Sequence, residues 1–160
     1  MSVNLEKRTV RGGDEALLEE AWALKERIRR EEGVLKQRRG FFARAYRRST
    51  VHCYLDPDAG ELVGFAAVRA DGYILFLAVA PQYRGEGFGE RLVAHAAEGH
   101  SRVTCHARTT NDNALAFYRH LGFEVVRRID HYYEDGGDAF YLRLGEGERL
   151  TDRLSSLLRR

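Results

Sequence analysis

The chain has 160 residues, of which 44% are hydrophobic and 31% charged, and its formal net charge at pH 7 is +2. This length fits one domain that buries about 70% of its unfolded surface, and the hydrophobic fraction is ordinary for a soluble globular protein. No apolar run approaches the roughly 20 residues that span a bilayer, and the amino terminus has no signal-peptide pattern, so we expect a cytoplasmic protein with no membrane partner.

The two cysteines, Cys53 and Cys105, each lie in an apolar, strand-like stretch. They are too few for a disulfide framework and lack the spacing of metal ligands, so they are predicted to be buried, inert thiols. The histidines form no Cys/His cluster of the kind that binds zinc. We therefore predict no metal.

Positive charge is concentrated between Lys25 and Arg48, a segment that contains ten Lys or Arg and three Glu. The local excess is therefore seven, and the remainder of the chain is net acidic by five. Such a segment can mark a surface for nucleic acid, the ribosome or another acidic partner, or it can be a solvated helical face. The sequence leaves these alternatives open.

The first half of the chain predicts a strand, two helices and a hairpin. Asp14 is a suitable N-cap for the first helix, and Gly33 a suitable end. In chain order the predicted elements are a strand over 3–11, helices over 14–33 and 41–47, and strands over 50–56 and 61–69 joined by a turn.

The second half alternates strands and helices. Its apolar run over 73–80 is typical of a strand that is covered on both faces. The further predicted elements are helices over 87–98 and 111–122, strands over 102–108, 123–133 and 139–145, and an amphipathic helical tail. The sequence thus predicts an α+β fold with a mixed sheet, as a single domain over 1–146 with a packed tail over 147–160.

A glycine-rich stretch, Arg84-Gly85-Glu86-Gly87-Phe88-Gly89, separates the apolar strand from a predicted helix. The first turn of a helix has unpaired N–H groups and about half a positive charge, which favours phosphate. Glycines let a pyrophosphate approach the backbone, and an arginine can add a bidentate contact. The spacing fits neither a P-loop nor a Rossmann fingerprint. The stretch predicts a phosphate-bearing ligand, with a ligand-free glycine turn as the alternative.

The same stretch resembles the Arg/Gln-x-x-Gly-x-Gly/Ala signature of the GNAT superfamily of N-acetyltransferases. The segment NDNALAFYRHLGFEVV, which follows about 20–25 residues later, resembles that superfamily's Asn…Tyr…Gly-Phe segment. The resemblance implies a three-layer α/β/α fold, in which helices flank a mixed, mostly antiparallel sheet with a splayed central parallel pair. It also implies acetyl-CoA as co-substrate.

In GNAT proteins the pantetheine arm pairs with the strand before the loop, and the pyrophosphate lies on the loop. A tyrosine on the later helix hydrogen-bonds the CoA sulfur and acts as general acid; Tyr118 matches it, with a packed helix aromatic as the alternative. A phenol, whose pKa is about 10, is protonated at pH 7 and can donate to a thiolate. The implied cofactor-binding residues are Leu77, Ala78, Val79, Arg84, Gly85, Glu86, Gly87, Phe88, Gly89, Asn111 and Tyr118.

The segment HYYEDGGDAFYL resembles protein N-terminal acetyltransferases, including the bacterial enzyme that acts on a ribosomal protein's alanine terminus. This implies that Tyr132 and Tyr133 lie on a hairpin over the peptide substrate, opposite a wall near Gly33–Phe42 to which Phe42 contributes. Cross-strand packing of the two tyrosines is the alternative. The expected partner is a protein N-terminus. Two other hypotheses stay open for the acceptor, a small amine and an internal lysine. A third is that the protein is a non-catalytic CoA-binding module with a basic surface that binds RNA or the ribosome.

Acetyl transfer to an α-amine requires only a modest base. The pKa of an α-amine is about 8 and that of lysine about 10.4, so at neutral pH lysine costs about 3 kcal/mol more to deprotonate. His106 suits this role. It matches a base position in some eukaryotic N-terminal acetyltransferases, which also have a tyrosine where Tyr73 stands, and the two could hold a proton-relay water. A structural histidine and a plain strand aromatic are the alternatives.

Overall fold

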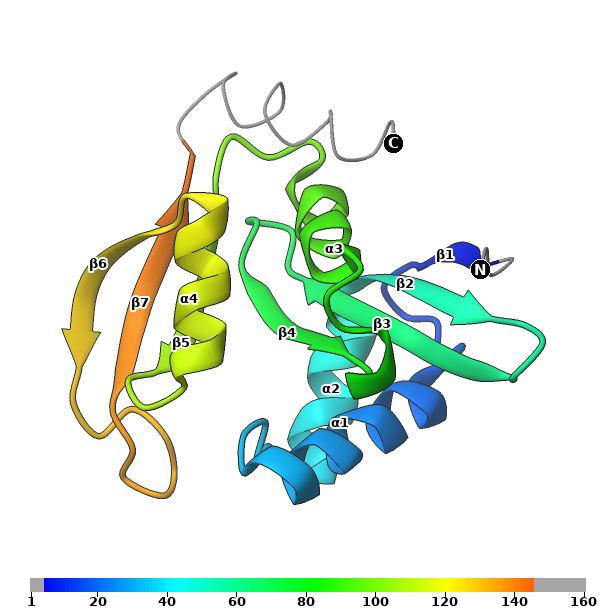
Figure 1. The fold of residues 1–160 in the computed structure, drawn as a ribbon, viewed down its shortest axis with the longest axis horizontal. Coiled ribbons are helices and arrows are strands. Elements are labelled where there is room, and N and C mark those ends of the chain that lie inside the picture. The colour runs from blue at the N-terminus through cyan, green and yellow to red at the C-terminus, as the bar shows by residue number, and fades with distance from the viewer. Residues whose placement is uncertain (1–4, 146–160) are drawn as a thin grey trace.

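The computed structural model describes residues 5–145, so the predicted tail helix over 147–160 lies outside the described residues. Figure 1 shows the chain as strands and helices in two halves. The elements are β1 (Glu6–Val10), α1 (Leu18–Glu32), α2 (Arg39–Arg48), β2 (Thr50–Asp56), β3 (Glu61–Val68), β4 (Ile74–Val79), the short η1 (Pro81–Tyr83), α3 (Phe88–Ala97), β5 (Val103–Arg108), α4 (Asp112–Leu121), β6 (Glu124–Ile129) and β7 (Ala139–Leu144).

The strands form two antiparallel sheets, of order β1-β2-β3-β4 and β5-β7-β6. The sheets meet where Tyr73 bridges Thr104 in parallel and the Thr104 N–H donates to the Gly72 carbonyl at 3.2 Å. Beyond this junction β4 and β5 are the edges of separate sheets. The α+β class and the splayed parallel pair are confirmed, whereas the single mixed sheet is divided in two.

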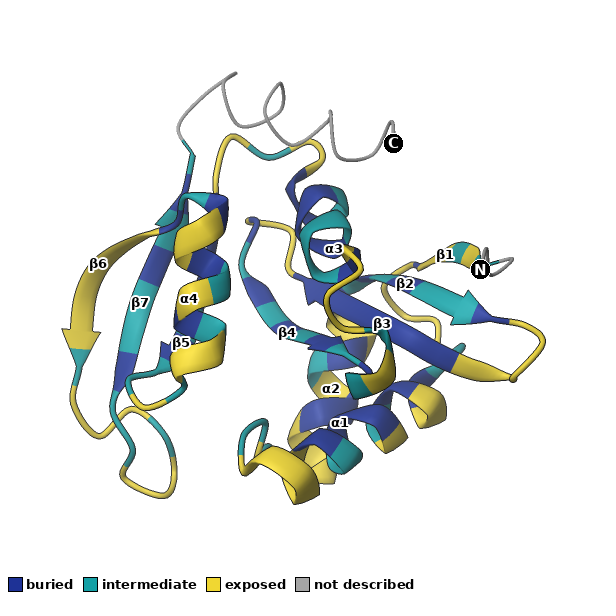
Figure 2. Cartoon of the chain, viewed as in Figure 1, coloured by how far each residue is buried: buried dark blue, intermediate teal, exposed yellow. Residues whose placement is uncertain are grey.

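Helices cover the first sheet on both faces. Every residue of β3 from Leu62 to Val68 is buried, which requires packing above and below it (Figure 2). Helix α1 contacts β3 and β4, and α3 contacts the same two strands. Two hydrophobic clusters result, one around Phe42 and Phe65 and the other around Val93 and Leu142. This packing fixes the positions of β4 and of the loop that follows it.

Two element ends differ from the sequence prediction. Helix α1 begins at Leu18 because the Asp14 carboxylate accepts the Ala16 N–H at 2.9 Å and forms a turn there. Strand β6 ends at Ile129 because His131 has a φ of +54° and donates its N–H to the Asp138 carboxylate at 2.9 Å. The two tyrosines that follow therefore lie in the β6–β7 loop rather than on a strand.

Both cysteines are buried, as predicted. Burial raises the pKa of the Cys53 thiol to about 11 and that of Cys105 to about 12, so both are protonated at neutral pH. Within residues 5–145 no group of three His, Cys, Asp or Glu side chains is arranged to hold a metal ion. In the same range no helix is long and apolar enough to cross a membrane.

The basic segment over 25–48 is largely paired within the fold. Lys25 is fully buried, its ammonium bound by the Gln37 carbonyl and lying 4.6 Å from the centre of the Trp22 ring. Carboxylates outside the segment pair with other members, in Arg39–Glu19, Arg47–Glu15, Lys36–Asp135 and Arg38–Glu134. This pairing leaves fewer free charges than the sequence count indicates. RNA or ribosome binding through the segment stays a prediction.

Candidate active site

The glycine loop is open to solvent at the start of α3. Gly85 and Gly87 have φ values of +81° and +88°, which disfavour any other residue, and a Cβ at either would meet no atom within 4 Å. Gly87 is the N-cap of α3, so the N–H groups of the first helical turn have no partners within the helix. Open backbone and free N–H groups together form a cradle suited to an anion.

Gly89 allows helices α3 and α4 to pack closely. A Cβ at this position would meet the Phe117 ring at 3.0 Å, so glycine lets α3 approach α4. Arg84 is anchored beside the loop: its guanidinium donates to both carboxylate oxygens of Glu32, at 2.9 and 2.7 Å, and its Nε donates to the Val79 carbonyl at 3.2 Å. This anchoring holds a cation next to the anion cradle.

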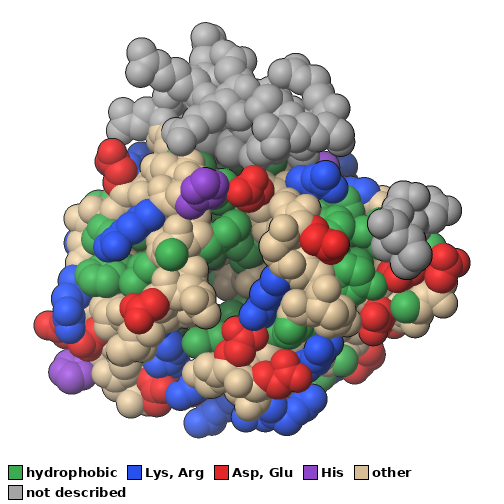
Figure 3. Space-filling model, in the orientation of Figure 1, with side chains coloured by type: hydrophobic (Ala, Val, Ile, Leu, Met, Phe, Trp, Pro, Cys, Tyr) green, Lys and Arg blue, Asp and Glu red, His purple; other side chains and the backbone are tan. Residues whose placement is uncertain are grey.

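A cavity of about 520 Å³ lies between β4, β5, the glycine loop and α4. The surface in Figure 3 is hollowed between the two halves of the molecule, and hydrophobic side chains border the hollow. All the predicted cofactor residues line this cavity except Glu86, which is exposed to solvent. We call it the first cavity.

The walls of the first cavity include two unpaired strand edges. Strand β4 is the last strand of one sheet and β5 the first of the other, so their facing backbone groups lack ladder partners beyond the Tyr73 bridge. Such edges pair readily with an extended ligand. Leu77 and Val79 are half-buried there, whereas the Ala78 side chain is buried in the core and only its backbone is available.

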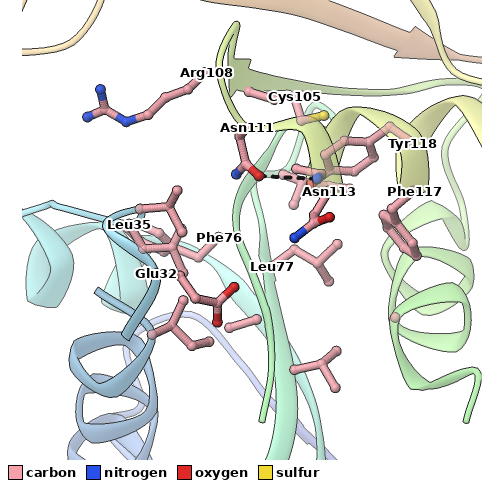
Figure 4. A pocket seen from close by; sticks show the side chains of 18 of the residues that line it. Glu32, Leu35, Phe76, Leu77, Cys105, Arg108, Asn111, Asn113, Phe117 and Tyr118 are labelled. Atoms are coloured by element: carbon pink, nitrogen blue, oxygen red, sulfur yellow. Dashed lines mark hydrogen bonds between the residues drawn. The ribbon is translucent and has the colours of Figure 1, made fainter. Parts of the chain in front are cut away.

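Tyr118 lies at the inner end of the first cavity beside Cys105 (Figure 4). Its ring packs edge-on against Phe117 and Phe123, with centroids 5.3 and 5.0 Å away. Burial raises the pKa of Tyr118 well above its usual value, so the phenol keeps its proton at neutral pH. Asn111 caps α4, accepting the Ala114 N–H at 3.2 Å, and also lines the cavity.

His106 is held by two tyrosines. The Tyr73 hydroxyl lies 2.5 Å from Nδ1, and the Tyr132 ring stacks on the imidazole at 4.3 Å. The sequence predicted a water between Tyr73 and His106, but the structure joins them directly. Burial lowers the pKa of His106, and the charge of Arg127 lowers it further. The imidazole is therefore neutral near pH 7 and able to accept a proton.

A second cavity, of about 1260 Å³, adjoins the first. His106 lines both. The Oε1 atom of Gln37 is buried without a hydrogen-bond partner, and an unpaired acceptor in such a place calls for a donor from a ligand. The residues common to both cavities are Lys36, Gln37, Leu75, His106, Arg108 and Tyr133.

The structure brings Tyr132 and Tyr133 to the second cavity. Arg108 lies 4.1 Å from the centre of the Tyr133 ring, and burial raises the pKa of Tyr133 to about 12. Phe42 is a correction to the sequence prediction, because its side chain is fully buried against Trp22, Phe65 and Phe76. Its neighbour Phe41 is half-exposed and lines the cavity instead.

Ion pairs join the loops that border the second cavity. Asp135 in the β6–β7 loop accepts from Lys36 at 3.1 Å and from Arg108 at 3.0 Å, and these cations hold its pKa well below the usual range. Lys36 and Gln37 lie within the wall predicted near Gly33–Phe42 but were not named singly, and sequence reasoning missed Arg108 and Asp135. The sequence could have indicated Arg108, because this residue follows His106 by two positions and so lies on the same face of β5.

Comparisons with known proteins agree with this geometry. Residues 47–125 match the model of the acetyltransferase (GNAT) domain. The N-alpha-acetyltransferase MAK3 of Arabidopsis thaliana is 38% identical over 104 residues, which cover 58% of this chain and 55% of that protein. The N-alpha-acetyltransferase RimI of Mycobacterium tuberculosis is 36% identical over 100 residues, which cover 56% of this chain and 63% of that protein. The chain thus spans between half and two thirds of these two relatives.

Among solved structures, the ribosomal-protein-S18-alanine N-acetyltransferase from Escherichia coli superimposes with a TM-score of 0.68. The match covers 89% of this chain and 94% of that one, at 22% identity, and so concerns the fold alone. The domain match over residues 47–125 and the sequence likeness to these two N-alpha-acetyltransferases make the chain a homologue of the GNAT acetyltransferases, and the splayed strands and the glycine cradle agree with this.

Proposed function

We propose that this protein transfers an acetyl group from acetyl-CoA to the α-amino group of a protein N-terminus. The observation that carries the proposal is the place of His106, a neutral imidazole in the lining of both cavities. One cavity has the features of a CoA site, and the other gives an amine access to the same histidine. The names of the relatives, N-alpha-acetyltransferases, support an α-amine as acceptor.

The first cavity suits acetyl-CoA, which supplies an activated thioester. The open cradle at Gly85 and Gly87, with Arg84 beside it, would hold the pyrophosphate. The unpaired edges of β4 and β5 would pair with the amide groups of the pantetheine arm. The thioester would then lie near Tyr118, at the inner end of the cavity.

The chemistry divides between two groups. The amine nitrogen attacks the thioester carbonyl, forming the C–N bond, and His106 takes the proton that the amine loses. The C–S bond breaks, and the protonated phenol of Tyr118 donates to the departing thiolate. Tyr73 orients the imidazole through its hydrogen bond to Nδ1. The buried Oε1 of Gln37 would accept an N–H of the incoming amine.

The weak base selects among amines. Because burial lowers the pKa of His106, the histidine suits an α-amine, whose pKa is about 8, better than a lysine, whose pKa is about 10.4. The difference corresponds to about 3 kcal/mol at neutral pH. An N-terminus is therefore the favoured acceptor over an internal lysine.

Matched peptides test the acceptor. Two peptides of one sequence, each with a single lysine, are offered with a free or a chemically blocked amino terminus, and the products are located by fragment mass spectrometry. We expect acetylation of the free α-amine alone. Acetylation of the blocked peptide would identify a lysine acetyltransferase, and turnover of small amines without either peptide would also contradict the proposal.

The cradle is tested by Gly87→Ala. A Cβ there would project into the open space that we assign to the pyrophosphate, so we expect the Kd for acetyl-CoA to rise about tenfold. The backbone cost of about 1 kcal/mol at positive φ lowers the folding stability and not the affinity. Gly13→Ala is the matched control, because Gly13 has a φ of +89°, open surroundings and no place in either cavity. Calorimetry that finds equal Kd values for the two variants would contradict the assignment.

A further inference from the structure

The second cavity has a marked excess of positive charge. Three carboxylates line it, Asp71, Glu134 and Asp135. The cations are seven in number, Lys36, Arg38, Arg44, Arg69, Arg102, Arg108 and Arg127. The lining thus has an excess of four positive charges. It also contains the imidazole to which the amine would be presented.

Each carboxylate is already paired. Asp71 accepts two hydrogen bonds from Arg69, at 3.0 and 2.6 Å, and Asp135 accepts from two cations. Glu134 pairs with Arg38 at 3.5 Å.

Three arginines of the lining, Arg44, Arg102 and Arg127, have no acidic partner within residues 5–145 and are exposed. Arg127 also lies over the Tyr141 ring, 5.3 Å from its centre. A guanidinium that lines a cavity and has no carboxylate partner can bind a carboxylate with two parallel hydrogen bonds.

The register of the second sheet places Arg127 close to His106. Arg127 is opposite Tyr141, and Tyr141 is opposite His106, so the three side chains share one face across β6, β7 and β5. Neighbouring strands lie about 4.8 Å apart, which puts the backbone of Arg127 about 10 Å from that of His106. The charge of Arg127 already acts on His106, whose pKa it lowers.

The other two arginines extend the charge further from His106. Arg102 precedes His106 by four residues, about 13 Å at the rise of a strand, and Arg44 lines the cavity from α2. An extended peptide with its amine at His106 advances about 3.3 Å per residue. Its second to fifth residues therefore come within reach of these guanidinium groups.

We propose that the second cavity selects protein N-termini with Asp or Glu among the second to fifth residues, which Arg44, Arg102 and Arg127 bind. This inference rests on the proposed function. A peptide is favoured over a nucleic acid because its free amino end can be presented to His106, which lines both cavities.

The test compares peptides that differ only at positions two to four, with three Asp, three Asn or three Lys. Both kcat/KM and the Kd for the protein saturated with CoA are measured, at about 50 and 300 mM salt. For the Asp peptide we expect a kcat/KM at least tenfold higher and a Kd at least tenfold lower than for the Asn peptide, and we expect both differences to shrink at high salt. The Lys peptide is the poorest.

Substitutions that each remove one positive charge show which arginines cause the preference for Asp. Arg127→Gln and Arg44→Gln should each reduce the Asp/Asn ratio severalfold, and the ratio cancels any effect of Arg127 on the base. Arg48→Gln is the matched control, since Arg48 is an exposed cation on the same helix as Arg44 and lines neither cavity. It should keep the wild-type ratio.

The two readouts separate this inference from the proposed function. Acetylation of Asp and Asn peptides with equal kcat/KM and Kd would overturn the acidic selectivity and leave the N-terminal activity standing. Tighter, Arg127-dependent binding of the Asp peptide without acetylation would support the acidic site and overturn the activity. Binding of an RNA oligonucleotide that these variants abolish, with no preference for Asp, would overturn the inference in favour of RNA.

Discussion

Replacing Tyr118 with phenylalanine should lower kcat about 100-fold or more and change the KM for acetyl-CoA by no more than about threefold. The phenol is buried and protonated, and it lies where the thiolate would leave. Phenylalanine keeps the packing against Phe117 and Phe123 and removes only the proton donor. Release of CoA, followed with a thiol reagent, measures the change.

A second buried tyrosine is the control. Tyr46 donates its hydroxyl to the Ala16 carbonyl at 2.5 Å and lines neither cavity. Tyr46→Phe should lower the free energy of unfolding by about 1 kcal/mol and leave kcat unchanged. If Tyr118→Phe kept the wild-type kcat, the thiolate would leave without this proton and the assignment would be wrong.

Replacing His106 with glutamine should lower kcat about 100-fold. It should also remove the decrease of kcat at low pH. A base must be unprotonated to act. Because burial and Arg127 lower the pKa of His106, the wild-type kcat should stay constant down to the ordinary histidine value of about 6.5 and fall only below it. Glutamine does not titrate, so this fall should disappear in the variant.

The profile is measured as kcat from pH 5 to 9. His120→Gln is the control, because His120 is an exposed histidine on α4 that lines neither cavity, and its profile should match the wild type. A His106→Gln protein whose kcat still decreased at low pH as in the wild type would mean that another group takes the proton.

Local patterns predicted much of the fold. Strand β2 was predicted at its observed bounds, from its alternation and the turn chemistry that follows it. Helix α4 was predicted to within a residue, because Asn111 caps its start and Gly122, with a φ of +102°, ends it. The glycine loop was found for the same reason, since its conformation depends on residues that are adjacent in the sequence.

Features that depend on distant contacts were beyond the sequence. Phe41 and Phe42 are adjacent on one helix, and only the packing of α2 on the sheet decides that Phe42 is buried. The position of Gln37 depends on a buried lysine twelve residues earlier, which binds its carbonyl. Nothing in the local pattern around these residues indicates either contact.

The basic segment illustrates the same limit. Its count of charges was available, but the carboxylates that neutralise Arg39 and Arg47 come from positions about 20 and 30 residues away. The arginines of the second cavity that lack a carboxylate partner within residues 5–145 come from α2, from the residue before β5 and from β6. Only the assembled fold gathers them around one imidazole.

The central claim is that an amine from the second cavity meets a thioester from the first at His106. A crystal structure with a peptide joined through its α-amine to CoA tests this most directly. We predict CoA along the glycine loop and between β4 and β5, the peptide in the second cavity, and the linking nitrogen about 3 Å from the imidazole or one water away. A peptide that left through the first cavity, with that nitrogen more than about 6 Å from His106, would contradict the claim.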